Sequence, residues 1–175
     1  MPIRALAARH AGQQALEGNR HTALQLYFRP FLSYSQKALI AIYEFAVPFE
    51  PKALDAPDGP ASLELARSWP MRRFPLPVDG DLVLPEASCI VEYIDACASG
   101  PLGPIPADPR AALKVRLTDR LFGNYVSTAQ QKGVFDAFRP PDARDPLGVY
   151  QARDRLNTAF AWPDTKMALR PWAAG

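Results

Sequence analysis

The chain has 175 residues, 48% of them hydrophobic and 22% charged, with a formal net charge of +2 at pH 7. This is the composition of a folded globular protein, and no apolar run approaches the roughly 18 residues of a membrane span. The sequence has no basic stripe of the kind that nucleic-acid-binding proteins carry. We therefore expect a protein that binds neither membrane nor nucleic acid.

Cysteine and histidine are scarce, with two of each. Cys89 and Cys97 are eight residues apart on one predicted helix, which separates them by about 12 Å along its axis, too far for a disulfide. Two unpaired thiols fit a reducing cytoplasm. His10 and His21 both lie near the N-terminus, so a zinc site lacks ligands. We expect a cytoplasmic protein without a metal.

Residues 1–22 are rich in Ala, Arg and Gln and contain a single acidic residue. They lack the apolar core of a secretory signal. An amphipathic targeting peptide and a disordered extension both fit this composition. We predict the disordered extension and leave it outside the fold.

Two strand–helix pairs open the folded part of the chain. In the first pair, a short strand leads into a helix whose start Ser33 or Ser35 can cap, and Pro48 ends that helix. In the second pair, a strand, a Pro/Gly loop and a weak helix follow one another. The expected bounds are 23–28 and 49–54 for the strands and 61–68 for the weak helix.

The most informative segment starts at Phe74. Pro75 follows it at the start of a strand, where an X-Pro bond can be cis at modest cost and turn the backbone groups of Phe74 outward. Asp79-Gly80 is a strong hairpin signal. Glu86 then opens a helix, whose unpaired N–H groups can hold a carboxylate. The order βαβαββα, with one parallel crossover and an antiparallel hairpin, predicts an α/β thioredoxin-like domain at 23–99.

A Pro/Gly-rich linker at 100–108 separates this domain from a helical region at 109–175. Asp108-Pro109 is a helix-start signal before a long helix expected at 109–138, and Asp145-Pro146 repeats it before a second helix. We therefore predict an incomplete all-α domain built from two helices.

The segments LYFRPFLSYSQKALIAIYEFAVPFE and FPLPVDGDLVLPEASCIVEYID, with the two helices after the linker, resemble a bacterial glutathione S-transferase over Leu24 to about Gly175. The resemblance implies glutathione as co-substrate and a small electrophilic molecule as second substrate. It also implies a homodimer formed through the Glu86 helix and the long helix after the linker. Because the family continues into further helices, we expect a truncated or decaying enzyme.

The resemblance implies a glutathione site along one strand end and two helix starts. Phe74, beside cis-Pro75, would pair its backbone with the cysteinyl part of glutathione, while Glu86 and the backbone N–H of Ala87 would hold the γ-glutamyl end. Arg73 would reach the glycine carboxylate. Each residue also has a purely structural explanation, such as a turn proline, a solvated arginine or an acid at a helix start.

Ser33 is the residue that we expect to act on the glutathione sulfur. A free thiol has a pKa near 8.5, and a hydroxyl donor with a helix dipole lowers it by favouring the thiolate. The thiolate then attacks an electrophilic carbon. Ser35 competes with Ser33 both for this role and for capping the helix, and Tyr34 is a weaker candidate.

Three features depart from the family pattern. Ala87 stands where serine is usual, which removes one side-chain hydrogen bond to the ligand, worth about 0.5–1.5 kcal/mol. Pro77 lies in a strand that should be central, where we expect a bulge. Two helices cannot bury their apolar faces as five do. We therefore expect partial exposure at Leu113, Leu117, Leu121, Val149, Leu156, Phe160 and Trp162.

Two functions stay open on this sequence. One is conjugation of glutathione to an electrophile, and the other is a non-catalytic module of the same type that binds thiol peptides or protein partners. A third function on the same fold, thiol–disulfide exchange, is excluded because the first helix opens with Ser33-Tyr34-Ser35-Gln36 and contains no cysteine there.

Overall fold

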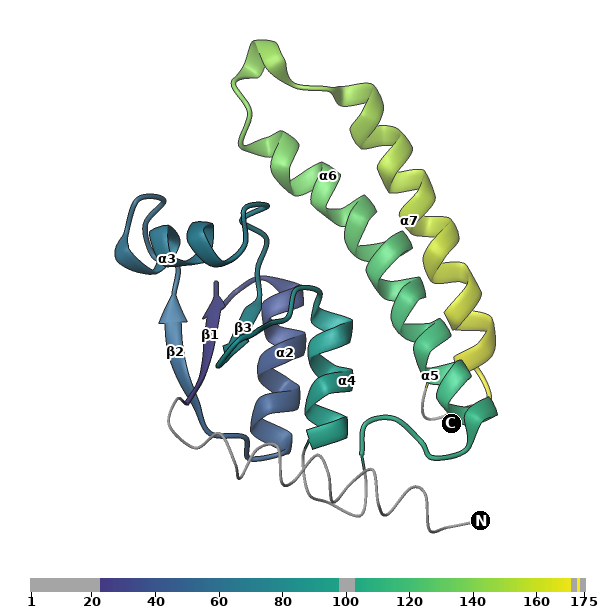
Figure 1. Cartoon of the computed structure of the whole chain (residues 1–175). Helices are drawn as coiled ribbons and strands as arrows, with labels where there is room; N and C mark the ends of the chain where they lie inside the picture. Colours follow the sequence, from purple (N-terminus) through teal and green to yellow (C-terminus); the bar gives the residue numbers. More distant parts are fainter. Residues whose placement is uncertain (1–22, 98–102, 171–172, 174–175) are drawn as a thin grey trace. The chain divides into compact units, whose positions relative to one another are not determined.

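The computed structural model describes residues 23–97, 103–170 and 173, and the chain divides into two compact units, Met1–Ile105 and Pro106–Gly175 (Figure 1). The extension predicted at 1–22 lies outside the described residues, as do residues 98–102, at the end of the predicted domain and the start of the predicted linker. Within the described ranges, no helix has the length and apolar character that a membrane span requires.

In the described part of the first unit, a four-stranded mixed sheet is joined by three helices. The sheet order is β2-β1-β3-β4; β1 pairs with β2 in parallel, and the other two pairings are antiparallel. This confirms the predicted thioredoxin-like order βαβαββα. The elements are β1 (Leu24–Phe28), α2 (Ser33–Glu44), β2 (Phe49–Ala53), α3 (Pro60–Ser68), β3 (Leu76–Asp79), β4 (Leu82–Val83) and α4 (Ala87–Cys97).

Each face of the sheet has its own core, because successive side chains of β1 point to opposite faces. Leu26 is fully buried among residues of α2 and α4, which lie side by side on one face (Figure 1). Its neighbour Tyr27 packs on the other face against Leu65 of α3 and Leu76 of β3. The central strand is therefore covered on both sides.

The bulge predicted at Pro77 is wrong. Pro77 stays in register opposite Leu26, between the pairs that Val78 and Leu76 make with β1. The carbonyl of Pro77 accepts a hydrogen bond from the Leu84 N–H at 3.1 Å, so its backbone polar groups face β4 and not β1. A proline there removes no N–H from the ladder with the central strand.

The second unit is a helical hairpin. The first arm contains α5 (Pro109–Arg120), a π-helical segment η1 (Leu121–Ser127) and α6 (Thr128–Ala137); after the short 3-10 turn η2 (Pro141–Ala143), the second arm is α7 (Pro146–Met167). The side chain of Asp108 caps α5 and that of Asp145 caps α7, as the sequence predicts. The π-helical segment was not predicted.

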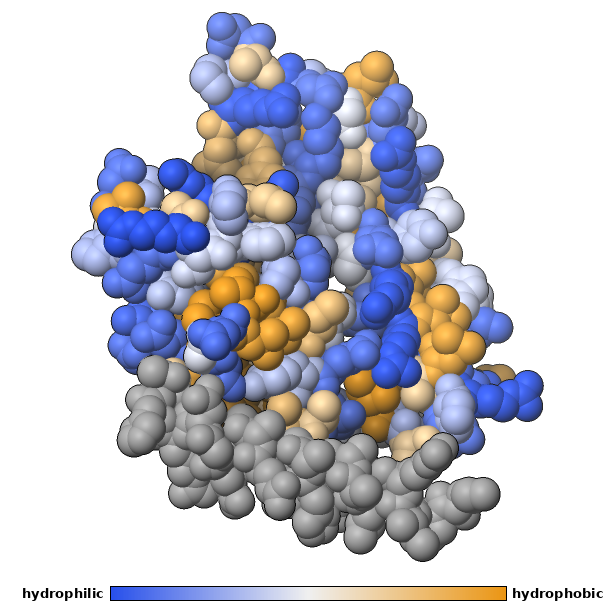
Figure 2. Space-filling model, viewed as in Figure 1, coloured by the Kyte–Doolittle hydropathy of each residue, from blue (hydrophilic) through white to orange (hydrophobic). Residues whose placement is uncertain are grey.

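Apolar side chains of the helical unit remain exposed, as predicted for a two-helix arrangement. Leu113 is 67% exposed and Trp162 45%. Figure 2 shows hydrophobic surface on this unit between the charged side chains. A groove of about 840 Å³ runs between η1, α6 and α7, with Leu121, Tyr125 and Trp162 on its walls. The hairpin alone therefore does not form a closed core.

Candidate functional site

The strand end at Phe74 has the backbone arrangement that the sequence predicts. The Phe74–Pro75 peptide bond is cis, and Pro75 is buried directly before β3. The Phe74 ring is half-buried and packs against the core formed by Tyr27, Leu54, Leu65 and Leu76. The position of Phe74 is therefore fixed by the fold.

Helix α4 begins at Ala87, one residue after Glu86. Glu86 has a φ of 76°, in the left-handed region that costs a non-glycine residue roughly 1–3 kcal/mol. Its carbonyl closes the first turn by accepting from the Ile90 N–H at 3.0 Å, while its side chain is exposed. Ala87 is 5% exposed, so only its backbone can serve a ligand. Among the residues that the structure describes, no partner of the Glu86 carboxylate is found, and this carboxylate lies at the start of α4.

The structure separates the two serines that the sequence could not tell apart. Ser35 is fully buried, and its hydroxyl accepts a hydrogen bond from the Arg29 backbone N–H at 3.3 Å. Ser33 is exposed, and no hydrogen bond to its hydroxyl is found within the part of the chain that the structure describes. Ser35 serves the fold, whereas the Ser33 hydroxyl is available to a ligand.

The prediction that a serine caps α2 is wrong. The N-cap residue is Leu32, which has extended backbone angles, and no side-chain capping bond is formed. The helix begins at Ser33, so both serines lie inside the helix, where neither occupies the capping position. The first-turn N–H groups of α2 thus lack a side-chain cap.

One contact holds the starts of α2 and α4 together. Lys37, one turn into α2, donates from Nζ to the Ser88 hydroxyl at 2.8 Å, and Ser88 is the second residue of α4. The two helix starts therefore lie at the same end of the unit. Ser33, the first residue of α2, and Glu86, directly before α4, therefore lie at this end of the unit.

Arg73 is exposed in the loop before Phe74, and its neighbour Arg72 has a φ of 52°. The Arg72 N–H donates to the Trp69 carbonyl at 2.9 Å, which closes a turn and sets the direction in which the chain enters the strand end. Among the described residues, Arg73 forms no ion pair that would neutralise its charge. The role of Arg73 at the glycine carboxylate stays a prediction.

Sequence reasoning missed Arg29, which directly follows β1. Its guanidinium carbon lies 5.6 Å from the centroid of the Phe74 ring, a cation–π distance. The sequence does contain one signal for Arg29: it is a basic residue at the end of a strand, four positions before the candidate Ser33. Trp69 was also missed: its indole Nε1 is buried and lacks a hydrogen-bond partner in the described structure.

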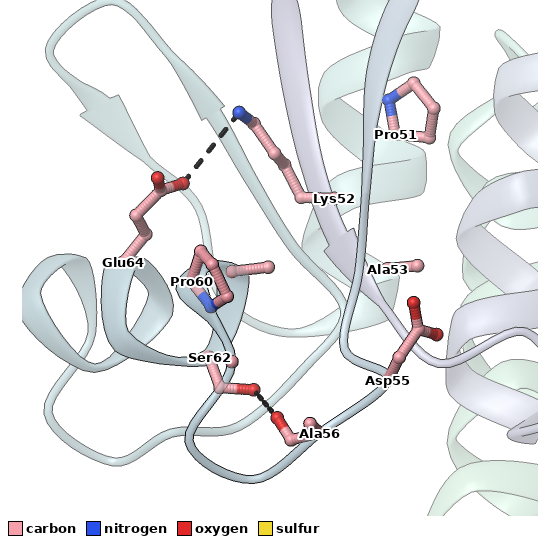
Figure 3. Close-up of a pocket in the computed structure, with 10 residues that line it drawn as sticks. Pro51, Lys52, Ala53, Asp55, Ala56, Pro60, Ser62 and Glu64 are labelled. Atoms are coloured by element: carbon pink, nitrogen blue, oxygen red, sulfur yellow. Dashed lines mark hydrogen bonds and ion pairs between the residues drawn. The ribbon is translucent and has the colours of Figure 1, made fainter.

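A separate pocket of about 390 Å³ lies between β2 and α3 (Figure 3). Lys52 points toward Glu64 across it, at 3.8 Å, and also pairs with Glu50 at 2.8 Å. The Tyr27 hydroxyl donates to Glu64 at 3.0 Å, and burial together with this bond raises the pKa of Tyr27. None of the predicted site residues lines this pocket. Its charged groups hold the sheet edge to α3.

The structure brings no metal-binding set together: within the described ranges, no three His, Cys, Asp or Glu side chains are close enough to share an ion. The described cysteines, Cys89 and Cys97, are free thiols. The predicted site residues carry hydroxyl, carboxylate, guanidinium and backbone groups.

Residues 22–96 match the family "Glutathione S-transferase, N-terminal domain". No protein of curated function matches the chain. Among solved structures, a glutathione S-transferase from Methylobacillus flagellatus with glutathione bound is 21% identical, with a TM-score of 0.77, over 87% of this chain and 74% of that one.

Two further structures are similar. A glutathione S-transferase from Methylobacterium radiotolerans, in complex with glutathione sulfonate, is 22% identical with a TM-score of 0.75, over 88% of this chain and 71% of that one. A theta-class enzyme from Xanthomonas axonopodis pv. citri, with glutathione bound, is 24% identical with a TM-score of 0.69, over 87% of this chain and 74% of that one. At these identities the likeness establishes the shared fold.

Proposed function

Because residues 22–96 match the N-terminal domain of glutathione S-transferases, we propose that the chain belongs to this family, binds glutathione and transfers it to a small electrophilic molecule. The observation that carries this proposal is that two helix starts lie close together. Each has a polar side chain for which no partner is found among the described residues. The Lys37–Ser88 contact holds the starts of α2 and α4 together, with the Ser33 hydroxyl on one and the Glu86 carboxylate beside the other. Similar folds with bound glutathione support it.

Glutathione is a tripeptide with a charged group at each end and a thiol in the middle. The Phe74 backbone would pair with its cysteinyl part. Glu86 would accept from the γ-glutamyl ammonium, and the Ala87 N–H would donate to the γ-glutamyl carboxylate at the positive end of α4. Arg73 would bind the glycine carboxylate at the other end.

Ser33 would donate its hydroxyl hydrogen to the glutathione sulfur. This bond favours the thiolate over the thiol and lowers the thiol pKa from its usual value near 8.5. The thiol proton leaves to solvent, and the sulfur lone pair forms a bond to the electrophilic carbon. In a substitution the leaving group departs with its electron pair; in an addition the π pair moves onto the neighbouring atoms.

The test is turnover of a chromogenic electrophile by wild type, Ser33→Ala and Ser33→Thr. We expect Ser33→Ala to lower kcat/KM by roughly tenfold or more, since one lost hydrogen bond to a charged atom is worth about 1.5–3 kcal/mol. Ser33→Thr keeps a hydroxyl and should retain most activity. Equal kcat/KM values for wild type and Ser33→Ala would overturn the role of Ser33.

A second candidate function is a non-catalytic glutathione-binding module. Two observations favour it: Leu32 occupies the N-cap of α2, and its side chain has no hydrogen-bonding group, while the buried Ala87 side chain at the start of α4 has none either. Saturable glutathione binding by wild type without turnover of any electrophile tested would favour this function over the transferase.

We further propose that the chain works as a homodimer in the cytoplasm, where Cys89 and Cys97 would stay reduced. Leu113 and Leu117, one turn apart on α5, are 67% and 56% exposed and supply an apolar stripe for the dimer contact with α4. Sedimentation equilibrium tests this: wild type should be a dimer and the Leu113→Lys/Leu117→Lys variant a monomer. A wild-type monomer would contradict it.

A further inference from the structure

Arg29 is held by two elements of the candidate site at once. Its backbone N–H donates to the buried Ser35 hydroxyl in the first turn of α2, at 3.3 Å. Its guanidinium lies over the Phe74 ring at the strand end, with the Cζ atom 5.6 Å from the ring centroid. Arg29 therefore lies between the helix start that carries Ser33 and the strand end that carries Phe74.

Among the described residues, no carboxylate neutralises the charge of Arg29. Within the part of the chain that the structure describes, Arg29 makes no ion pair, whereas Lys52 and Lys132 each contact a carboxylate. The aromatic face orients a guanidinium but does not cancel its charge. An oriented, uncompensated cation next to a polar helix start is suited to an anion.

We propose that Arg29 stabilises the thiolate of bound glutathione. This inference rests on the proposed function, in which Phe74 and Ser33 contact the cysteinyl part from either side. A cation beside a thiol favours the ionised form of that thiol. Ser33 supplies a hydrogen bond to the sulfur, and Arg29 supplies the positive charge.

The test compares wild type with Arg29→Gln, Arg29→Met and Arg29→Lys. Arg29→Met keeps an apolar stem against Phe74 and loses the charge, whereas Arg29→Lys keeps the charge. Arg67→Gln, at an exposed position in the last turn of α3, is the matched control for loss of a surface arginine. The readout is the thiolate ultraviolet absorbance of bound glutathione as a function of pH, which requires binding but no turnover.

We expect the two uncharged variants to raise the pKa of the bound thiol by about one unit, so that the thiolate fraction well below the pKa falls about tenfold. Arg29→Lys and Arg67→Gln should titrate within a few tenths of a unit of wild type. Affinity for S-methylglutathione, which has no thiol to ionise, should change less than twofold in every variant.

Three outcomes separate the inference from the proposed function. If wild type binds glutathione and the folded Arg29→Met or Arg29→Gln variant titrates like wild type, the inference is overturned and the proposed function stands. If these variants lose S-methylglutathione as well, Arg29 only supports binding and the inference is again overturned. If folded wild type binds no glutathione, both fail.

Discussion

At the scale of single residues, Glu86 combines an unfavourable backbone conformation with an exposed carboxylate. Its φ of 76° suits glycine, so Glu86→Gly should stabilise the folded protein by about 0.5–1 kcal/mol. The same change removes the carboxylate proposed to bind the γ-glutamyl ammonium. Urea unfolding and glutathione titration of the same sample measure the two effects.

Glu86→Gln is the control, because it removes the charge without changing the backbone preference of the position. We expect it to lose glutathione affinity at unchanged stability. If Glu86→Gly destabilised the protein, the unfavourable backbone conformation assigned to Glu86 would be wrong. If both variants bound glutathione as tightly as wild type, the assignment of the Glu86 carboxylate to the ligand site would be wrong.

Ser33 and Ser35 should differ in stability as well as in function. Ser35→Ala removes the acceptor of the Arg29 N–H from a fully buried position and should cost about 1 kcal/mol. Ser33→Ala removes an exposed hydroxyl and should change the free energy of unfolding by less than about 0.5 kcal/mol. Chemical denaturation of both variants decides this; equal losses would contradict the structure.

The sequence could not separate these two serines because both stand near a helix start whose position it fixes only to within a residue or two. Once Leu32 is the N-cap, Ser35 faces the core and Ser33 faces solvent. The sequence did not predict a role for Arg29 for a related reason. Its role depends on contacts with Ser35 and Phe74, and Phe74 is distant in the sequence.

At the scale of elements, the start of α7 is closely packed. A Cβ added at Gly148 would lie 2.1 Å from an Asp145 carboxylate oxygen and 2.6 Å from Lys132 Cε. Because these atoms are the ends of side chains, Gly148→Ala should push them aside and weaken the cap of α7, a loss worth about 0.5–2 kcal/mol.

The matched control for this substitution is Gly133→Ala in α6, where an added Cβ meets nothing within 4 Å. Because alanine is favoured over glycine inside a helix, it should stabilise by about 0.5–1 kcal/mol. Circular-dichroism melts of both variants should shift in opposite directions. A shift in the same direction would show that the packing at Gly148 is not as described.

The same helix start predicts a pH dependence. Lys132, 2.5 Å away, and the Gly148 N–H hold the pKa of Asp145 below its usual value. A lowered folded-state pKa means that folding favours the carboxylate. The stabilisation is therefore fully present above about pH 4 and is lost as the pH falls through the folded-state pKa.

Asp145→Asn keeps an N-cap acceptor and removes the titration, so its melting temperature should fall less between about pH 5 and pH 3 than that of wild type. Thermal melts across this range measure the difference. Parallel curves for the two proteins would contradict a role for Asp145 ionisation in stability.

The helices and strands could be predicted from the sequence better than the local backbone geometry within them. The helix starts at Asp108 and Asp145 follow from side-chain capping, which is a local property. The π-helical segment at Leu121–Ser127 and the regular strand at Pro77 depend on packing and on which way the backbone groups face. Neither property is recorded in residue spacing.

At the scale of the molecule, the thioredoxin-like unit could be derived because its order of elements, its hairpin turn and its strand-end proline are all local signals that agree. The structure divides into two compact units at Ile105, and the linker at 100–108 stays a prediction. The sequence does not predict a binding partner of the helical unit, because exposed apolar side chains such as Leu113 and Trp162 identify no partner by themselves.

The most direct test of the account is calorimetric titration of the folded wild-type chain with glutathione, with a thermal melt of the same sample. We expect saturable binding and a raised melting temperature, because a ligand at 100 times its Kd adds about 2.7 kcal/mol to the stability of the folded state. Glu86→Gln should reduce both. A cooperatively folded wild type that gives no binding heat and no shift at millimolar glutathione would contradict the central claim.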